Sequence, residues 1–133
     1  MRPEIEVCAA MIYKDGKILI SQRPKGDRYE GKWEFPGGKR EEGEDLKQCI
    51  EREIREELGL KIETEEILFE TLYEMRERKI RIYLLRCKLK GMVKKKDPSF
   101  HLYRWVTLKE AEKYDLLPPD REFLKKLRQI DLN

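Results

Sequence analysis

Short runs of alternating or continuous apolar residues, bounded by glycine and charged residues, divide much of the chain into candidate strands. These runs are rich in β-branched and other apolar residues, which is typical of strands. They cover residues 4–13, 17–23, 33–35, 66–73, 79–89 and 102–107. Asp15-Gly16 predicts a hairpin between the first two runs, because both of its positions tolerate positive φ. Pro36-Gly37-Gly38 is expected to end the third run.

Residues 45–58 carry a helical pattern with a defined start and end. Asp45 suits the N-cap, and Gln48, three residues later, completes a capping box. Gly59 suits the left-handed position that ends a helix. The sequence therefore predicts one well-delimited helix in the middle of the chain.

Two further helices are expected near the end of the chain. Thr107 and Glu110 form another capping box, which predicts a short helix. After Pro118-Pro119, residues 120–130 predict a closing helix with one apolar face. That face consists of Phe123, Leu124, Leu127 and Ile130. Strands outnumber helices and no linker is visible, so we predict a single α+β domain over residues 1–133 with a central mixed sheet.

The composition excludes several classes of protein. Charged residues make up 43% of the chain, but the net charge is only +3, too small to predict a nucleic-acid partner. No apolar run approaches the ~18 residues of a membrane span. The start of the chain lacks the apolar core of a signal peptide. We expect a cytoplasmic protein with neither a membrane nor a nucleic-acid partner.

The three cysteines, Cys8, Cys49 and Cys87, lie far apart in the sequence, and the single histidine is His101. Without a CxxC pair or a Cys/His cluster, the sequence predicts neither a zinc site nor a disulfide scaffold. Each cysteine has apolar or helical neighbours, so we expect three small buried side chains in a reducing compartment.

Acidic residues of the helix at 45–58 fall in phase with its buried face. At about 100° per residue, Glu53 and Glu57 continue the apolar stripe of the first turns, and Glu56 lies beside it. That stripe consists of Leu46, Cys49 and Ile50. Carboxylates on an inward stripe cost free energy unless they are neutralised.

Two interpretations of this acidic cluster are open. Arg52 and Arg55 could neutralise it as an ordinary surface ion-pair network. Alternatively, clustered oxygen ligands without histidine or cysteine suit Mg²⁺ or Mn²⁺, and Mg²⁺ also takes phosphate oxygens of a substrate. In that case a bound metal would let an acidic site hold a polyphosphate.

The spacing around this helix resembles the Nudix hydrolases. Their signature is Gly, five residues, Glu, seven residues, Arg-Glu-apolar, one residue, Glu-Glu, one residue, Gly-apolar. Residues 38–60 match every fixed position. The resemblance implies an α/β/α sandwich around a mixed sheet, and cleavage of a nucleoside diphosphate linked to another group. The segments 33–39 and 118–120 resemble the MutT-type enzymes, including the cytidine triphosphate pyrophosphohydrolase branch.

The resemblance also implies roles for individual residues. Glu53, Glu56 and Glu57 would bind the metal, Mg²⁺ or Mn²⁺, with help from the Gly37 carbonyl. Glu53 would also be the general base. Arg52 would orient Glu53, and Glu44 would anchor Arg52.

Four further residues would bind the nucleotide. Arg23 and Lys39 would contact phosphates, Phe35 would line the base pocket, and Asp120 would meet the base edge. An ionised carboxylate only accepts hydrogen bonds, so Asp120 favours a cytosine or guanine edge that presents N–H groups. Each of three residues also has a simpler interpretation. Arg23 could be an exposed arginine at the end of a strand, Phe35 could pack in the core, and Asp120 could be the N-cap of the last helix.

One departure concerns an additional glutamate that MutT-type enzymes often carry before the penultimate strand. Its position falls at Ser99 here, with Asp97 and His101 nearby. Asp97 would replace it if the loop shifts; otherwise Glu53 acts alone. His101 is more commonly a packing or surface residue.

The leading hypothesis is a metal-dependent nucleoside triphosphate pyrophosphohydrolase that sanitises a nucleotide pool, with an oxidised-guanine or cytidine-type substrate. A dinucleoside polyphosphate or nucleotide-sugar hydrolase is the enzymatic alternative. The non-enzymatic alternative is a Nudix-shaped nucleotide recognition domain, which the intact box glutamates disfavour. The expected partner is a small-molecule nucleotide, and the protein is either a monomer or a homodimer.

Overall fold

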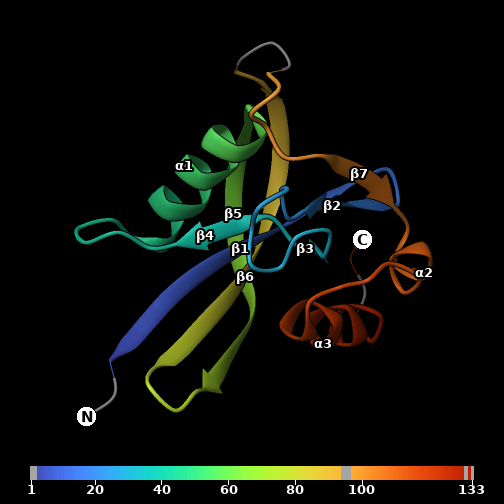
Figure 1. The fold of residues 1–133 in the computed structure, drawn as a ribbon. Helices are drawn as coiled ribbons and strands as arrows, with labels where there is room; N and C mark the ends of the chain where they lie inside the picture. The colour runs from blue at the N-terminus through green and yellow to red at the C-terminus, as the bar shows by residue number, and fades with distance from the viewer. Residues whose placement is uncertain (1–2, 94–96, 131, 133) are drawn as a thin grey trace.

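The computed structural model describes residues 3–93, 97–130 and 132, and has a mixed sheet between helices (Figure 1). The strands are β1 (Glu4–Lys14), β2 (Lys17–Gln22), β3 (Trp33–Glu34), β4 (Gly37–Lys39), β5 (Leu60–Glu74), β6 (Lys79–Met92) and β7 (Tyr103–Val106). The helices are α1 (Leu46–Leu58), α2 (Leu108–Ala111) and α3 (Pro118–Leu127). α1 covers one face of the sheet, and α3 covers the other. The predicted α/β/α arrangement is confirmed.

β1 is the central strand of the sheet. The order β3-β2-β1-β6-β5 places it between β2 and β6, while β4 also pairs with β1 and β7 pairs with β2. β1 runs parallel to β6, and the other pairs are antiparallel. Its middle residues are therefore buried on both faces, as expected for a strand covered by helices on both sides. These residues are Cys8, Ala9, Ala10, Met11 and Ile12.

The two faces of the sheet carry separate cores. On one face, Ile50, Ile54 and Leu58 of α1 pack with residues of β1, β2, β5 and β6. On the other face, Phe123, Leu124 and Leu127 of α3 pack with Met11, Ile20, Trp33, Phe35 and Leu84. Fully burying a large apolar side chain stabilises a fold by about 1.5–3 kcal/mol, so these two interfaces hold the helices in place.

The caps of α1 form as predicted. The side chain of Asp45 accepts a hydrogen bond from the Gln48 backbone N–H at 2.7 Å, and the Gln48 side chain accepts one from the Asp45 backbone at 2.8 Å. Gly59 has φ +68°, in the left-handed region where a side chain would be strained. The local signals thus fix the length of the helix that carries the acidic cluster.

Several predicted boundaries are wrong. β3 ends before Pro36, as predicted, but Gly37–Lys39 forms a strand that was not predicted: as β4 it pairs antiparallel with β1. β6 continues to Met92, three residues beyond the run predicted at 79–89. α3 begins at Pro118, because proline fits the first helical turn, where backbone N–H groups have no partner in the helix. Ile130 lies beyond α3 and is 40% exposed.

All three cysteines are buried, as expected, but two of them are not free thiols. Cys8 of β1 and Cys49 of α1 form a disulfide, which links two elements 41 residues apart in sequence. Cys87 is a free, buried cysteine, as predicted. Among the described residues, no helix has both the length and the apolar character needed to cross a membrane.

Candidate active site

Arg52 of α1 is the centre of an ion-pair network. Its Nε and Nη2 groups donate to the two carboxylate oxygens of Glu44, at 3.0 and 2.7 Å. Its Nη1 group donates to Oε1 of Glu53 at 2.8 Å, and Nη2 also donates to the Lys39 carbonyl at 3.1 Å. The paired guanidinium lowers the pKa of Glu44 to about 2. Arg52 therefore fixes Glu53 relative to the loop that precedes α1.

Glu53 lies directly against Gly38 of β4. A Cβ atom added at Gly38 would overlap the Glu53 carboxyl group, so only glycine leaves room for it in this position. At Gly37, a Cβ atom would instead overlap the backbone of Cys8 and Ala9 in β1. The two glycines thus serve different purposes: Gly37 allows β4 to approach β1, and Gly38 admits the Glu53 carboxyl.

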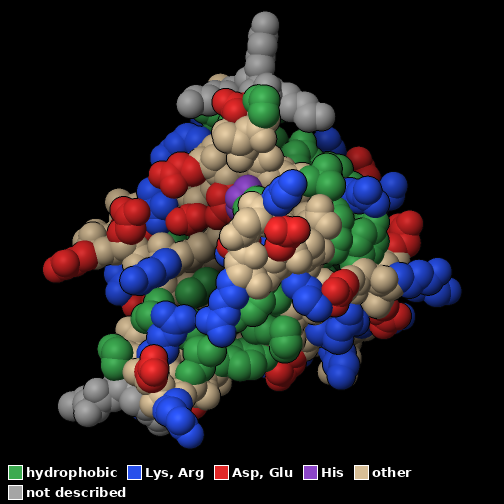
Figure 2. Space-filling model, viewed as in Figure 1, with side chains coloured by type: hydrophobic (Ala, Val, Ile, Leu, Met, Phe, Trp, Pro, Cys, Tyr) green, Lys and Arg blue, Asp and Glu red, His purple; other side chains and the backbone are tan. Residues whose placement is uncertain are grey.

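Glu57 lies one turn beyond Glu53, and the side chains of both are only 15% exposed. Burial is the main cause, and the adjacent Glu53 carboxyl the second, of a rise in the pKa of Glu57 to about 9. Glu56 is different: its side chain is 58% exposed, and its Oε2 accepts a 3.3 Å hydrogen bond from Arg52. The inward phase predicted for Glu53 and Glu57 is confirmed. Figure 2 shows acidic side chains gathered beside the histidine on this face.

The cluster has the chemistry of a divalent-cation site. In the described part of the chain, no three or more His, Cys, Asp or Glu side chains are already arranged so that they could hold a metal ion. The candidate ligands are nevertheless all oxygens, which suits a hard cation: the carboxylates of Glu53, Glu56 and Glu57, and the Gly37 carbonyl that the family resemblance implies. Ionising both of these half-buried carboxyl groups would place two negative charges in contact, which a cation would offset. These residues fit Mg²⁺ or Mn²⁺.

The loop between β6 and β7 brings one more residue to the cluster. Nδ1 of His101 lies 3.0 Å from Oε2 of Glu57. Asp97 and Ser99 instead bond to each other, since Asp97 Oδ1 accepts from both the N–H and the hydroxyl of Ser99 at 2.8 Å. Of the three candidates for replacing the additional family glutamate, His101 contacts a glutamate of α1.

Arg23, a predicted phosphate ligand, is paired with two carboxylates. It donates to both oxygens of Asp27, at 3.1 and 2.6 Å, and to Oε2 of Glu34 at 3.2 Å. Burial raises the pKa of Glu34 to about 7. Neither Asp27 nor Glu34 was predicted as a site residue from the sequence. The signal for Glu34 was present: a polar residue between Trp33 and Phe35, which are both buried on the α3 face, must point to the opposite face.

The predicted base-pocket residues lie deeper in the molecule. Phe35 belongs to the core beside α3 and is 3% exposed. Oδ1 of Asp120 accepts a 2.9 Å hydrogen bond from the Phe35 backbone N–H, and burial raises the pKa of Asp120 well above its usual value. Asp120 is not the N-cap of α3, because Leu117 holds that position. Lys39 is exposed on β4.

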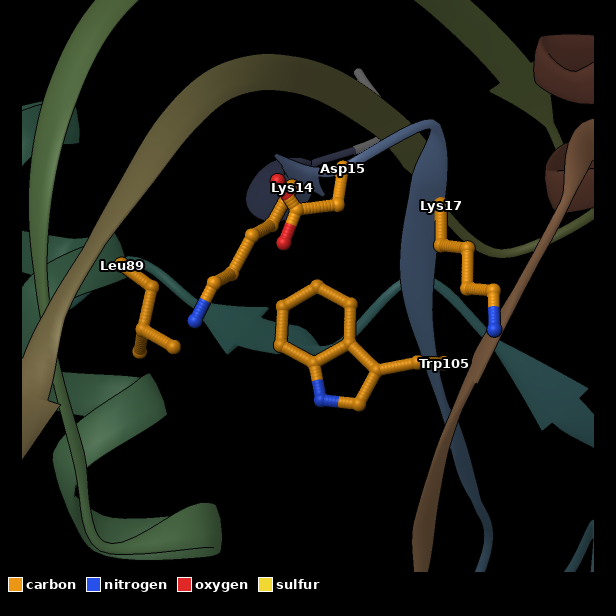
Figure 3. A pocket seen from close by; sticks show the side chains of 5 residues that line it. All are labelled: Lys14, Asp15, Lys17, Leu89 and Trp105. Atoms are coloured by element: carbon orange, nitrogen blue, oxygen red, sulfur yellow. The ribbon is translucent and has the colours of Figure 1, made fainter.

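Two open cavities differ in their relation to the cluster. One, of about 360 Å³, is lined by Gln22, Arg23, Pro24, Lys25, Glu30, Gly31, Phe100, His101 and Leu102. It contains His101, which contacts Glu57, and it presents two cations. The other, of about 420 Å³, is lined by Lys14, Asp15, Lys17, Leu89 and Trp105 (Figure 3). This second cavity shares none of the site residues. Of these two cavities, the first is therefore the better candidate for binding a substrate.

The NUDIX domain family model matches residues 2–127 of this chain. The chain belongs to the Nudix family. Its signature spans β4 and α1, so it includes Glu53, which lies against Gly38, and Glu57, the neighbour of Glu53. The sequence-based recognition of this family is therefore confirmed.

Individual Nudix relatives extend over nearly the whole chain. The CTP pyrophosphohydrolase of Escherichia coli is 35% identical over 130 residues, covering 91% of this chain and 89% of the relative. The 8-oxo-dGTP diphosphatase of Buchnera aphidicola is 30% identical over 125 residues, covering 93% of each. The crystal structure of the MutT protein from Methanosarcina mazei has a TM-score of 0.79 at 28% identity, covering 96% of this chain and 95% of that one.

Proposed function

We propose that this Nudix hydrolase splits a nucleoside triphosphate into a monophosphate and pyrophosphate. The observation that carries the proposal is the contact of the Glu53 carboxyl with both Gly38 and Glu57, with Arg52 fixed between Glu44 and Glu53. The names of the relatives support the substrate class, since they act on CTP and on 8-oxo-dGTP. A role in removing unwanted nucleotides from the pool follows from the same comparison.

The proposed roles follow from the contacts of each side chain. Glu53 accepts the proton of the attacking water, and Arg52 holds its carboxylate in place. Glu44 keeps Arg52 in position through two hydrogen bonds. Glu53, Glu56, Glu57 and the Gly37 carbonyl would hold Mg²⁺. When bound, the cation lowers the pKa of water and neutralises phosphate oxygens.

The nucleotide would enter the cavity beside His101. Arg23 and Lys25 line this cavity and supply positive charge for a polyphosphate, and we place Lys39 with them as a third phosphate contact. To bind phosphate, Arg23 must exchange part of its bidentate pair with Asp27. Asp120 and Phe35 would form the base end of the site, which requires Asp120 to keep one oxygen for the base while the other accepts from Phe35.

The product identifies the reaction. A panel of ribo- and deoxyribonucleoside triphosphates, 8-oxo-dGTP, dinucleoside polyphosphates and nucleotide sugars is incubated with the protein and Mg²⁺. Orthophosphate is measured with and without added inorganic pyrophosphatase. The proposal expects orthophosphate only when pyrophosphatase is present, and only from triphosphates. Direct release of orthophosphate, or turnover only of dinucleotides or sugars, contradicts it.

A matched pair of variants links the reaction to the cluster. Glu53→Gln keeps the shape of the side chain but removes its basicity, so turnover should fall by at least about a hundredfold while nucleotide binding remains. Glu77→Gln is the control, because Glu77 is exposed in the turn between β5 and β6 and is not part of the proposed site. Equal turnover of the two variants would refute the role of Glu53, and binding without any turnover by the wild type would indicate a recognition domain.

A further inference from the structure

The loop that precedes β7 is attached to the C-terminal end of α1 at two points. The His101 backbone N–H donates to the Glu57 carbonyl at 2.9 Å. The ring of Phe100 fills the space above Gly59, where an added Cβ atom would lie 2.6 Å from Phe100 Cε2. The contacts of Asp97 with Ser99 and Phe100 close the turn before them. The position of His101 relative to Glu57 is therefore set by the backbone rather than by a flexible side chain.

The two side chains meet in a shielded environment. Nδ1 of His101 and Oε2 of Glu57 are 3.0 Å apart, and the side chains are 17% and 15% exposed. Both atoms are buried, and neither has a well-aligned hydrogen-bond partner among the described residues. A buried acceptor and a buried ring nitrogen at this distance need only a reorientation of the imidazole for Nδ1–H to point at the carboxylate.

We propose that His101 is a positioning residue for Glu57: its Nδ1–H holds Oε2, so that the other carboxylate oxygen faces the cation. A neutral imidazole has one N–H, and its location is set by the available acceptor. With Oε2 held, Glu57 keeps a single orientation, and less conformational freedom is lost when the cation binds. Outer partners of this kind commonly change metal affinity by about 10–100-fold.

The inference depends on the proposed function only in requiring that the cluster binds a divalent cation. The test therefore measures Mn²⁺ binding by isothermal titration calorimetry, without nucleotide. His101→Asn and His101→Leu form a matched pair. In asparagine, Nδ2 is as many bonds from Cβ as Nδ1 is in histidine, whereas leucine has nearly the same shape without a donor. Urea unfolding of both variants reports any general loss of stability.

The expected result is Mn²⁺ affinity within about threefold of wild type for His101→Asn and at least about tenfold weaker for His101→Leu, at similar unfolding midpoints. Equal losses in both variants would mean that the ring only packs, and would overturn the inference. Unchanged affinity in both would overturn it too. A wild-type protein that binds no Mn²⁺ would overturn both this inference and the proposed function. If wild type binds Mn²⁺ and turns over nucleotide, but the two variants have the same Mn²⁺ affinity as each other, only this inference is overturned.

Discussion

The disulfide between Cys8 and Cys49 links the central strand to the helix that carries the acidic cluster. Reducing it should destabilise the protein by an amount set mainly by the loop that it closes. With a sequence separation of 41 residues, the chain-entropy relation gives an entropy loss of about 13 cal/mol/K in the unfolded state, or about 4 kcal/mol at 25 °C. For a domain of this size, that corresponds to a decrease in Tm of roughly 15 °C.

Two assays test this prediction. Cells are lysed directly into guanidinium chloride with an alkylating reagent, and the alkyl groups on each chain are counted by mass: one, on Cys87, is expected without reductant, and three when reduction precedes alkylation. Urea unfolding is then measured with and without reductant. Burial raises the pKa of Cys87 to about 12, so this residue stays a thiol, and Cys87→Ala should show the same reductant effect as wild type.

A Cys8→Ala/Cys49→Ala double variant should lose the reductant effect entirely. Three reactive thiols without reductant, or an unfolding midpoint that reductant leaves unchanged, would refute the reasoning. The result also tests the expectation of a reducing compartment, because disulfides are rare in the cytosol except in hyperthermophiles. The lysine- and glutamate-rich composition is compatible with such an origin.

Three further predictions concern the site. Arg52→Lys should lower kcat by at least about tenfold, because an ammonium cannot replace the bidentate guanidinium; unchanged steady-state kinetics would contradict this. Burial raises the pKa of Glu34 from 4.5 to about 7. The resulting contribution to the free energy of unfolding is fully present below pH 4.5 and is lost as pH rises through 7. Wild type should therefore lose about 3 kcal/mol relative to Glu34→Gln over this range, and parallel urea midpoints from pH 4.5 to 8 would refute it. Gly38→Ala should reduce turnover with little effect on the urea midpoint, because it displaces the Glu53 side chain, whereas Gly37→Ala should lower the midpoint because it meets backbone; the reverse pattern would disprove this division.

The predicted elements failed where pairing depended on distant neighbours. Gly37 and Gly38 carry no strand signal, because glycine has little strand preference, yet they pair with β1 when the fold brings that strand alongside. Met92 is part of β6 because β5 runs antiparallel beside it, with Leu60 opposite. In contrast, the ends of α1 were predicted correctly, because capping involves residues only three or four positions apart.

The sequence alone determined that Arg52, Glu53, Glu56 and Glu57 share one end of a helix, because helical periodicity fixes the relative directions of residues a few positions apart. Only the tertiary structure placed Glu53 against Gly38, His101 against Glu57, and Cys8 against Cys49. The physical reason is the distance along the chain: these contacts join separate elements, and they form only because burial of the two cores packs α1 and the loops onto the sheet.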